Sequence, residues 1–347
     1  MDLETMIATL RARAPWRNVA RVGLKYLDLP VGQGWEDTVP DLLAPNALTP
    51  RQLAGLESLV MEHLIVGEKS LRIYKVGRKE IDKLAGTSVG KKPSSHAIAA
   101  GLPSAHAEAD LAAIGAVPPK FGRYVEGDEG DALVFAGVRS YQQRVVLAPD
   151  SIKASVAGDR DFESVIGVVN RWRMTYDAVW LPKSGKYLYV LADYPADSTS
   201  DFPVQSHVAL ERMISKQIGV DLEPVDLFPA VAGLYDAPDG DVVELGFITD
   251  DDSVKHLKAR QGKKCLRKDG YHSAGATFVG NALLPFKVAV RWQRLLKPGL
   301  IVQPEVLLPG TSRTIYGLNN HLYDCVLRNC LSLRDLHLIQ SKLSPHI

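Results

Sequence analysis

The most regular hydrophobic spacing in the N-terminal third of the chain begins after Thr49. Apolar residues recur there at the three- and four-residue intervals of a helix face: Leu53, Leu56, Leu59, Val60 and Leu64. Thr49 and Gln52 are spaced as a capping box, and Pro50 stands at the first helical position, where its missing N–H is not needed. The pattern predicts a helix from Pro50 to Gly67, followed by a half-buried strand over residues 70–76.

Strand-like patterns dominate from residue 132 onward. Residues 176–181 and 186–193 are rich in apolar side chains and flank the turn sequence Pro182-Lys183-Ser184-Gly185. This arrangement predicts an antiparallel hairpin that contributes to the core. Apolar positions over residues 206–218 follow a helical period, and residues 321–338 are expected to form a closing helical region.

The order of these elements favours the α+β class, with a mixed N-terminal helical domain followed by a larger strand-rich α+β domain. Residues 115–131 contain two prolines, four glycines and four acidic residues but few apolar residues, which is typical of a loop. We therefore predict a mostly helical domain over residues 1–125 and an α+β domain over residues 132–347.

Charge is distributed unevenly along a chain whose net charge is only +1. Residues 221–254 include ten acidic residues and no Lys or Arg, whereas residues 255–297 include eleven basic residues and one acid, Asp269. A helix starting at Thr249 or Asp250 would explain part of this switch, because aspartates are favoured at a helix N-terminus and lysines at its C-terminus. The basic residues beyond such a helix need another explanation.

Clustered Lys and Arg side chains suit the phosphate backbone of nucleic acids. The predicted binding residues are Lys255, Lys258, Arg260, Lys263, Lys264, Arg267, Lys268, Lys287, Arg291 and Arg294. Tyr271, Phe286 and Trp292 are interleaved with these charges and could stack on unpaired bases. We expect a non-catalytic nucleic-acid-binding protein, with DNA and RNA both open as partners. The competing interpretation is that the rings belong to the core and that the basic segment neutralises the acidic one.

Two further functions compete with this hypothesis. A metal-dependent nuclease could use Glu244 and Asp250–Asp252 as metal ligands with Lys255 nearby, although their spacing matches no nuclease signature. Alternatively, the chain is an interaction subunit whose acidic and basic faces each dock a protein partner or a second copy.

No cofactor site is expected from the motifs. The segment from Gly86 to Pro93 departs from a phosphate-binding P-loop, because it has three residues instead of four between its glycines and Lys92 where Ser or Thr is needed. His321 and Cys325 are spaced one helical turn apart, but no second pair of zinc ligands accompanies them. We therefore predict neither a cofactor nor a bound metal.

The compartment is predicted from three absences in the sequence. No apolar run approaches the ~18 residues of a membrane span, the first residues do not form a secretory signal, and three cysteines are too few for a disulfide framework. These features predict a cytoplasmic protein with no membrane partner.

Overall fold

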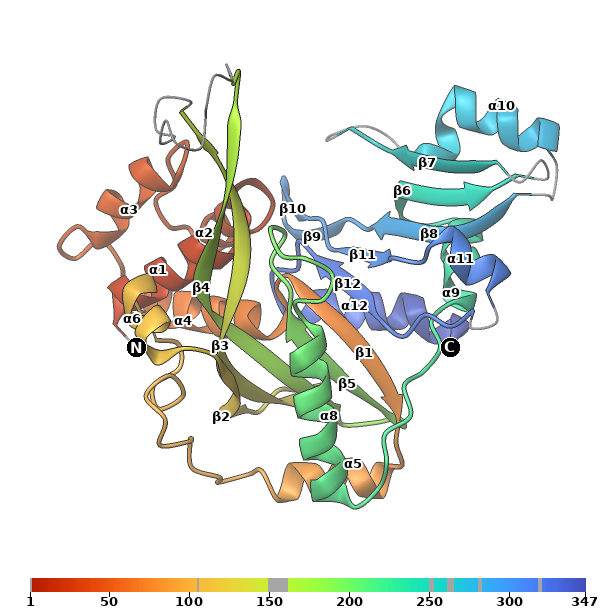
Figure 1. Ribbon diagram of the computed structural model, residues 1–347. Coiled ribbons are helices and arrows are strands. Elements are labelled where there is room, and N and C mark those ends of the chain that lie inside the picture. Colours follow the sequence, from red (N-terminus) through yellow and green to blue (C-terminus); the bar gives the residue numbers. More distant parts are fainter. Residues whose placement is uncertain are drawn as a thin grey trace.

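The computed structural model describes residues 2–104, 106–148, 162–249, 253–260, 265–279, 283–317 and 320–347. Its centre is one ten-stranded sheet with the strand order β2-β3-β4-β5-β1-β12-β11-β8-β6-β7 (Figure 1). Every neighbouring pair in this sheet is antiparallel. The predicted α+β class is confirmed.

The sheet is built from β1 (Lys69–Lys75), β2 (Val117–Val125), β3 (Gly130–Leu147), β4 (Val165–Pro182), β5 (Tyr187–Asp193), β6 (Asp241–Ile248), β7 (Val254–Lys258), β8 (Leu284–Arg291), β11 (Glu305–Leu308) and β12 (Cys325–Arg328). A separate pair comprises β9 (Arg294–Lys297) and β10 (Leu300–Val302). The described α-helices are α1 (Leu3–Arg13), α2 (Arg21–Tyr26), α3 (Trp35–Leu43), α4 (Pro50–Val66), α5 (Arg78–Gly86), α6 (Glu108–Ile114), α8 (Val204–Ile218), α9 (Pro229–Asp236), α10 (Gly270–Val279), α11 (Ser312–Tyr316) and α12 (Leu333–Leu343).

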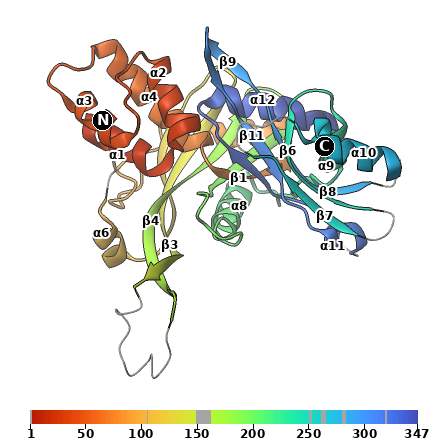
Figure 2. The ribbon, with the colours of Figure 1, turned by 90° about the horizontal axis from the view of Figure 1, so that it is seen from above.

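Helices cover the two faces of the sheet differently. On one face, α5 and α8 bury Leu84 and Leu210 against Leu188 of β5. On the opposite face, the end of α4 together with α9 and α12 closes a larger core that includes Val288 and Val306. The N-terminal helices α1 to α3 pack with α4 into a neighbouring cluster. β3 and β4 also extend away from this body as a long ribbon, which Figure 2 shows from above.

Three predictions from local pattern are confirmed. Both hydrogen bonds of the Thr49 capping box are present at the start of α4. The hairpin of β4 and β5 is formed, with Val179 opposite Val190. Leu188 of β5 is fully buried, and α8 ends at Gly219 in the left-handed conformation that glycine adopts easily.

The sheet crosses the predicted domain boundary. β1 comes from the N-terminal third but lies between β5 and β12, in the middle of the sheet. The prediction of a loop over residues 115–131 is wrong, because β2 pairs with β3 there. Pro118 and Pro119, which are typical of a loop, lie within β2. Proline is tolerated in an edge strand, and the register of β2 shifts at this point.

The predicted helix after Thr249 is also wrong. Val254–Lys258 is the edge strand β7, which pairs with β6, so Lys255 lies opposite Phe247. Five residues are too few to separate a strand from a helix by pattern, and the hydrogen bonds to β6 decide. The aspartates at 250–252, expected to begin that helix, lie outside the described residues.

The closing region is partly helical. Residues 325–328 form β12 between β1 and β11, and only the segment from Leu333 onward is helical. His321 and Cys325 are therefore not one helical turn apart. A short apolar run is equally compatible with a buried strand, and contacts with β1 and β11 select that state.

Candidate nucleic-acid interface

One part of the predicted basic site is exposed at the outer end of the sheet. Lys255, Lys258, Arg260 and Lys268 are all exposed there. β7 is the last strand of the sheet, and α10 lies beside it, far from the N-terminal helices (Figure 1). Lys263 and Lys264 lie outside the described residues. The structure thus places four of the ten predicted residues around the β7–α10 end.

Three of the remaining basic side chains pair with carboxylates. Lys287 forms an ion pair with Glu244, and Arg291 lies 2.7 Å from Glu305. Arg294 lies 2.6 Å from Asp335, whose side chain is fully buried. Among the described residues, the predicted site therefore does not form one continuous basic face.

Arg267 has a structural role within the chain. Its guanidinium donates hydrogen bonds to the carbonyl oxygens of Tyr235 at 3.1 Å and Asp239 at 3.3 Å, and also to those of Ala237 and Gly240. These carbonyls belong to the last turn of α9 and to the turn that follows it, where helical partners are missing and cations are favoured. Arg267 stabilises this turn and is not free to bind a phosphate.

Glu244, the residue proposed as a metal ligand, is surrounded by cations. Burial would raise the pKa of its carboxyl group, but the hydrogen bond and charge of Lys287, with further cations nearby, hold it below the usual value. Arg328 approaches it at 3.7 Å and Lys258 at 3.9 Å. In the part of the chain that the structure describes, no three His, Cys, Asp or Glu side chains are grouped closely enough to hold a metal ion.

A cavity of about 430 Å³ lies between β7 and α10. Apolar side chains such as Phe247 and Leu257 form much of its lining, and Lys255 and Tyr271 also line it. Tyr271 is 85% exposed, which is unusual for a large aromatic residue. The cavity thus combines apolar walls with an exposed ring and a cation.

His272 forms a fixed wall of this cavity. It is buried, its Nε2 lies 3.0 Å from the hydroxyl of Tyr235, and its ring packs edge-on against Phe247 at 5.6 Å. Burial lowers the pKa of His272, which keeps the imidazole neutral near pH 7. The wall is therefore uncharged, so the positive charge at the site comes from the exposed lysines.

The sequence pointed to aromatic side chains near the charges but did not separate exposed from buried rings. Phe286 and Trp292 are both buried, as the competing interpretation expected. Only Tyr271 of these three is available to a partner. The cavity itself was not visible in the sequence, because β6, β7 and α10 form it only after folding.

The comparisons with known proteins add no functional information. No protein family model, curated protein or solved structure matches the chain. Within the described ranges, no helix combines the length and hydrophobicity that a membrane-spanning segment requires.

Proposed function

We propose that the protein binds single-stranded nucleic acid at the β7–α10 end of the sheet and does not cleave it. The observation that carries this proposal is the exposed ring of Tyr271 beside an apolar cavity. Lys255 lines the same cavity, and Lys258, Arg260 and Lys268 are further exposed cations on neighbouring segments of the chain. An unpaired base can enter such a cavity or stack on the ring, while the cations contact the phosphates. Bases in a duplex are already stacked and paired, which favours a single strand.

A simpler explanation exists for the lysines of β7. Charged side chains on an exposed edge strand prevent it from pairing with the edge of another molecule. That role requires the charges but not the ring of Tyr271 or the cavity. The two explanations are therefore separated by variants that remove the ring and leave the charges.

The first test is a fluorescence anisotropy titration with labelled single-stranded DNA and RNA at increasing salt. Four phosphate contacts predict that log K falls with log salt at a slope of about −2.8. The double variant Lys255→Ala/Lys268→Ala should flatten the slope by about 1.4. Lys79→Ala removes an exposed charge from α5 at a distant site and should leave the slope unchanged.

The second test concerns the ring. Tyr271→Ala should weaken binding by about 1–3 kcal/mol with an unchanged salt slope, whereas Tyr271→Phe should retain the affinity. The labelled single-stranded DNA or RNA should remain uncleaved after incubation with the protein and magnesium. The proposal fails if no strand binds at low salt, if Tyr271→Ala binds normally, or if the strand is cleaved in a magnesium-dependent manner.

The β3–β4 ribbon favours a second candidate, a protein-interaction subunit. The described part of the ribbon exposes Val146, Ile166 and Val168 by 78%, 60% and 59%. Exposed apolar strands of this kind associate readily, and we propose a second copy as the partner. Sedimentation should show a concentration-dependent dimer that Ile166→Lys abolishes; a monomer at all concentrations would exclude the dimer.

In either case we place the protein in the cytoplasm, consistent with three buried free cysteines.

A further inference from the structure

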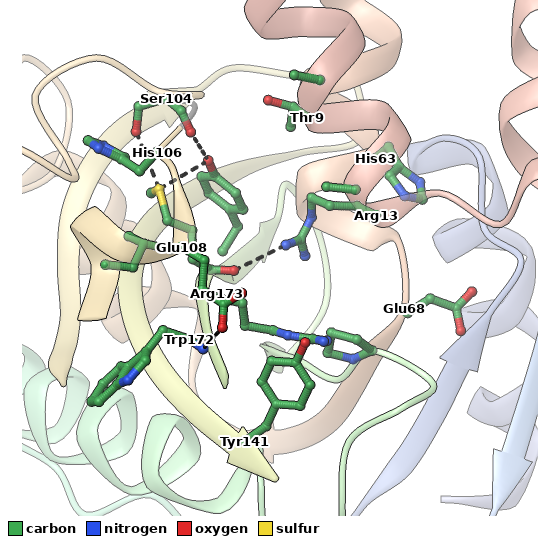
Figure 3. A pocket seen from close by; sticks show the side chains of 16 residues that line it. Thr9, Arg13, His63, Glu68, Ser104, His106, Glu108, Tyr141, Trp172 and Arg173 are labelled. Carbon is green, nitrogen blue, oxygen red and sulfur yellow. Dashed lines mark hydrogen bonds between the residues drawn. The ribbon is translucent and has the colours of Figure 1, made fainter. Parts of the chain in front are cut away.

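A second cavity, of about 340 Å³, lies between α1, the end of α4 and β4, at the other end of the molecule from α10. Arg13, Tyr141 and Arg173 line it together with Tyr176 and His106. Figure 3 shows Arg13 reaching into this space from α1 and Tyr141 pointing toward it from the opposite side. The cavity is therefore lined by side chains from segments far apart in the sequence.

Arg13 belongs to a buried group of charged side chains, which we call the Asp193 cluster. It comprises Arg13, Lys69, Arg139, Asp177 and Asp193. Arg13 forms an ion pair with Asp193, and Lys69 lies 3.0 Å from the same carboxylate oxygen. Both Asp193 and Lys69 have fully buried side chains. Burying five charged groups is costly unless their arrangement is needed.

The Asp193 cluster has a surplus of positive charge. Arg139 lies 2.9 Å from Asp177, whose other oxygen accepts a hydrogen bond of 2.7 Å from Ser206. Counted with their usual charges, three cationic and two anionic side chains leave a formal surplus of one positive charge. In a buried site this charge acts on its surroundings with little screening from water. It favours a ligand with a single negative charge.

Two hydrogen-bonding atoms in the cavity lining lack a partner. Nε of Arg13 and Nε2 of His106 are buried and make no hydrogen bond with any described residue. Arg13 uses its other nitrogens for Asp193 and for the carbonyl oxygen of Met174 at 3.4 Å. An unsatisfied N–H group in a buried site favours an acceptor such as an acid oxygen.

The other charged groups that line the cavity are paired with an opposite charge or, in Glu68, neutral below a pKa that burial raises to about 7. Arg173 pairs with Asp197 at 2.6 Å and lies over the ring of Tyr141 at 3.7 Å. The carboxylate of Glu68 points away from the cavity (Figure 3) and accepts a hydrogen bond from the backbone N–H of Asn329. Glu108 pairs with Arg171 at 3.1 Å. Among the described residues, the Asp193 cluster therefore supplies the net charge beside the cavity when Glu68 is protonated.

We infer that this cavity binds a small organic monocarboxylate, whose acid group accepts a hydrogen bond from Nε of Arg13. Its uncharged part lies against the rings of Tyr141 and Tyr176. A phosphate dianion fits less well, because its second negative charge has no counterpart in the Asp193 cluster. This site is separate from the β7–α10 end and does not depend on nucleic-acid binding.

The competing explanation is that Arg13 only fastens α1 to the sheet. A structural tie would be indifferent to added anions, so ligand binding to the unmodified full chain separates the two explanations. Benzoate, acetate, inorganic phosphate and benzylamine are the probes, because benzoate and benzylamine share a ring but carry opposite charges. The melting temperature is measured against the concentration of each probe at constant ionic strength.

Benzoate should raise the melting temperature in a saturable manner with a Kd at least tenfold lower than that of phosphate, and benzylamine should have no effect. Arg13→Lys keeps the charge but loses Nε–H and should weaken benzoate binding at least tenfold. Arg11→Lys, on an exposed side chain of the same helix, should bind benzoate normally. The NMR resonance of Arg13 Nε in the unmodified protein should shift on addition of benzoate, which tests the contact even if Arg13→Lys is unstable.

Three results would overturn the inference. Phosphate binding as tightly as benzoate contradicts a monoanion site. Normal benzoate binding by a folded Arg13→Lys variant contradicts the role of Nε. The absence of both a melting-temperature change and an Nε shift with either carboxylate contradicts the site itself.

Discussion

The two charged regions of this protein, the β7–α10 end and the Asp193 cluster, are built in opposite ways. At the β7–α10 end the charges are close in sequence and exposed; Lys258, for example, has a side chain that is 76% exposed. In the Asp193 cluster they come from α1, β1, β3, β4 and β5 and are almost entirely buried. Exposed pairs are worth little because water screens them, whereas buried pairs are strongly coupled. A dense run of charges in the sequence is therefore a poor guide to where charge matters most.

The largest effect is expected from removing the central carboxylate. Asp193→Asn leaves Arg13 and Lys69 buried without their partner and should lower the free energy of unfolding by about 3–5 kcal/mol. Asp197→Asn breaks the pair between the exposed carboxylate of Asp197 and Arg173, and should cost less than about 1 kcal/mol. Urea denaturation of both variants measures the difference. Equal losses would show that burial does not strengthen the cluster.

The acid sensitivity of the cluster follows from the same carboxylate. Burial alone would raise the pKa of Asp193, but Arg13, Lys69 and Arg139 lower it from 3.8 to about 2. The stability that Asp193 contributes should be fully present above its unfolded pKa and lost as the pH falls through its folded pKa. Asp193→Asn should lack this part of the acid transition.

A second pH effect is expected from Glu68. Burial raises the pKa of its carboxyl group from 4.5 to about 7. The folded state therefore retains a proton that the unfolded state releases, and stability should fall between these two values by up to about 3 kcal/mol as the pH rises. Glu68→Gln should remove this fall, which urea denaturation at several pH values measures relative to the unmodified protein. If the free energies of unfolding of Glu68→Gln and of the unmodified protein change in parallel with pH, the raised pKa of Glu68 is contradicted.

An intermediate effect is expected where basic residues are paired on the sheet. Lys287→Met leaves Glu244 with weaker partners and should lower the free energy of unfolding by about 1–2 kcal/mol. Affinity for single-stranded nucleic acid should not change, because Lys287 already neutralises Glu244. If Lys287→Met weakens nucleic-acid binding but leaves the free energy of unfolding unchanged, Lys287 belongs to the binding interface.

The smallest effect on stability is expected at the exposed end. The double variant Lys255→Ala/Lys268→Ala removes two exposed side chains and should change the free energy of unfolding by no more than about 0.5 kcal/mol. Thermal or urea denaturation of the double variant tests this. A larger loss would mean that these lysines support the fold.

Local patterns in the sequence determined several elements on their own. The helix after Thr49, the β4–β5 hairpin and α8 could be predicted because capping, turn chemistry and apolar spacing depend on neighbouring residues. The exposure of the lysines near β7 also agrees with their polar character. These features need no knowledge of distant contacts.

Only the tertiary structure decided the placement of β1, the pairing of β2 and β7, and the partners of the charged side chains. Arg13 and Asp193 are 180 positions apart, and the sequence around either residue does not predict their contact. The sequence likewise does not predict the partners of Arg267 and Arg294. In the fold, Arg267 bonds to backbone carbonyls and Arg294 pairs with Asp335. The physical reason is that strand pairing and ion pairing depend on proximity in space, which chain topology creates and local sequence does not encode.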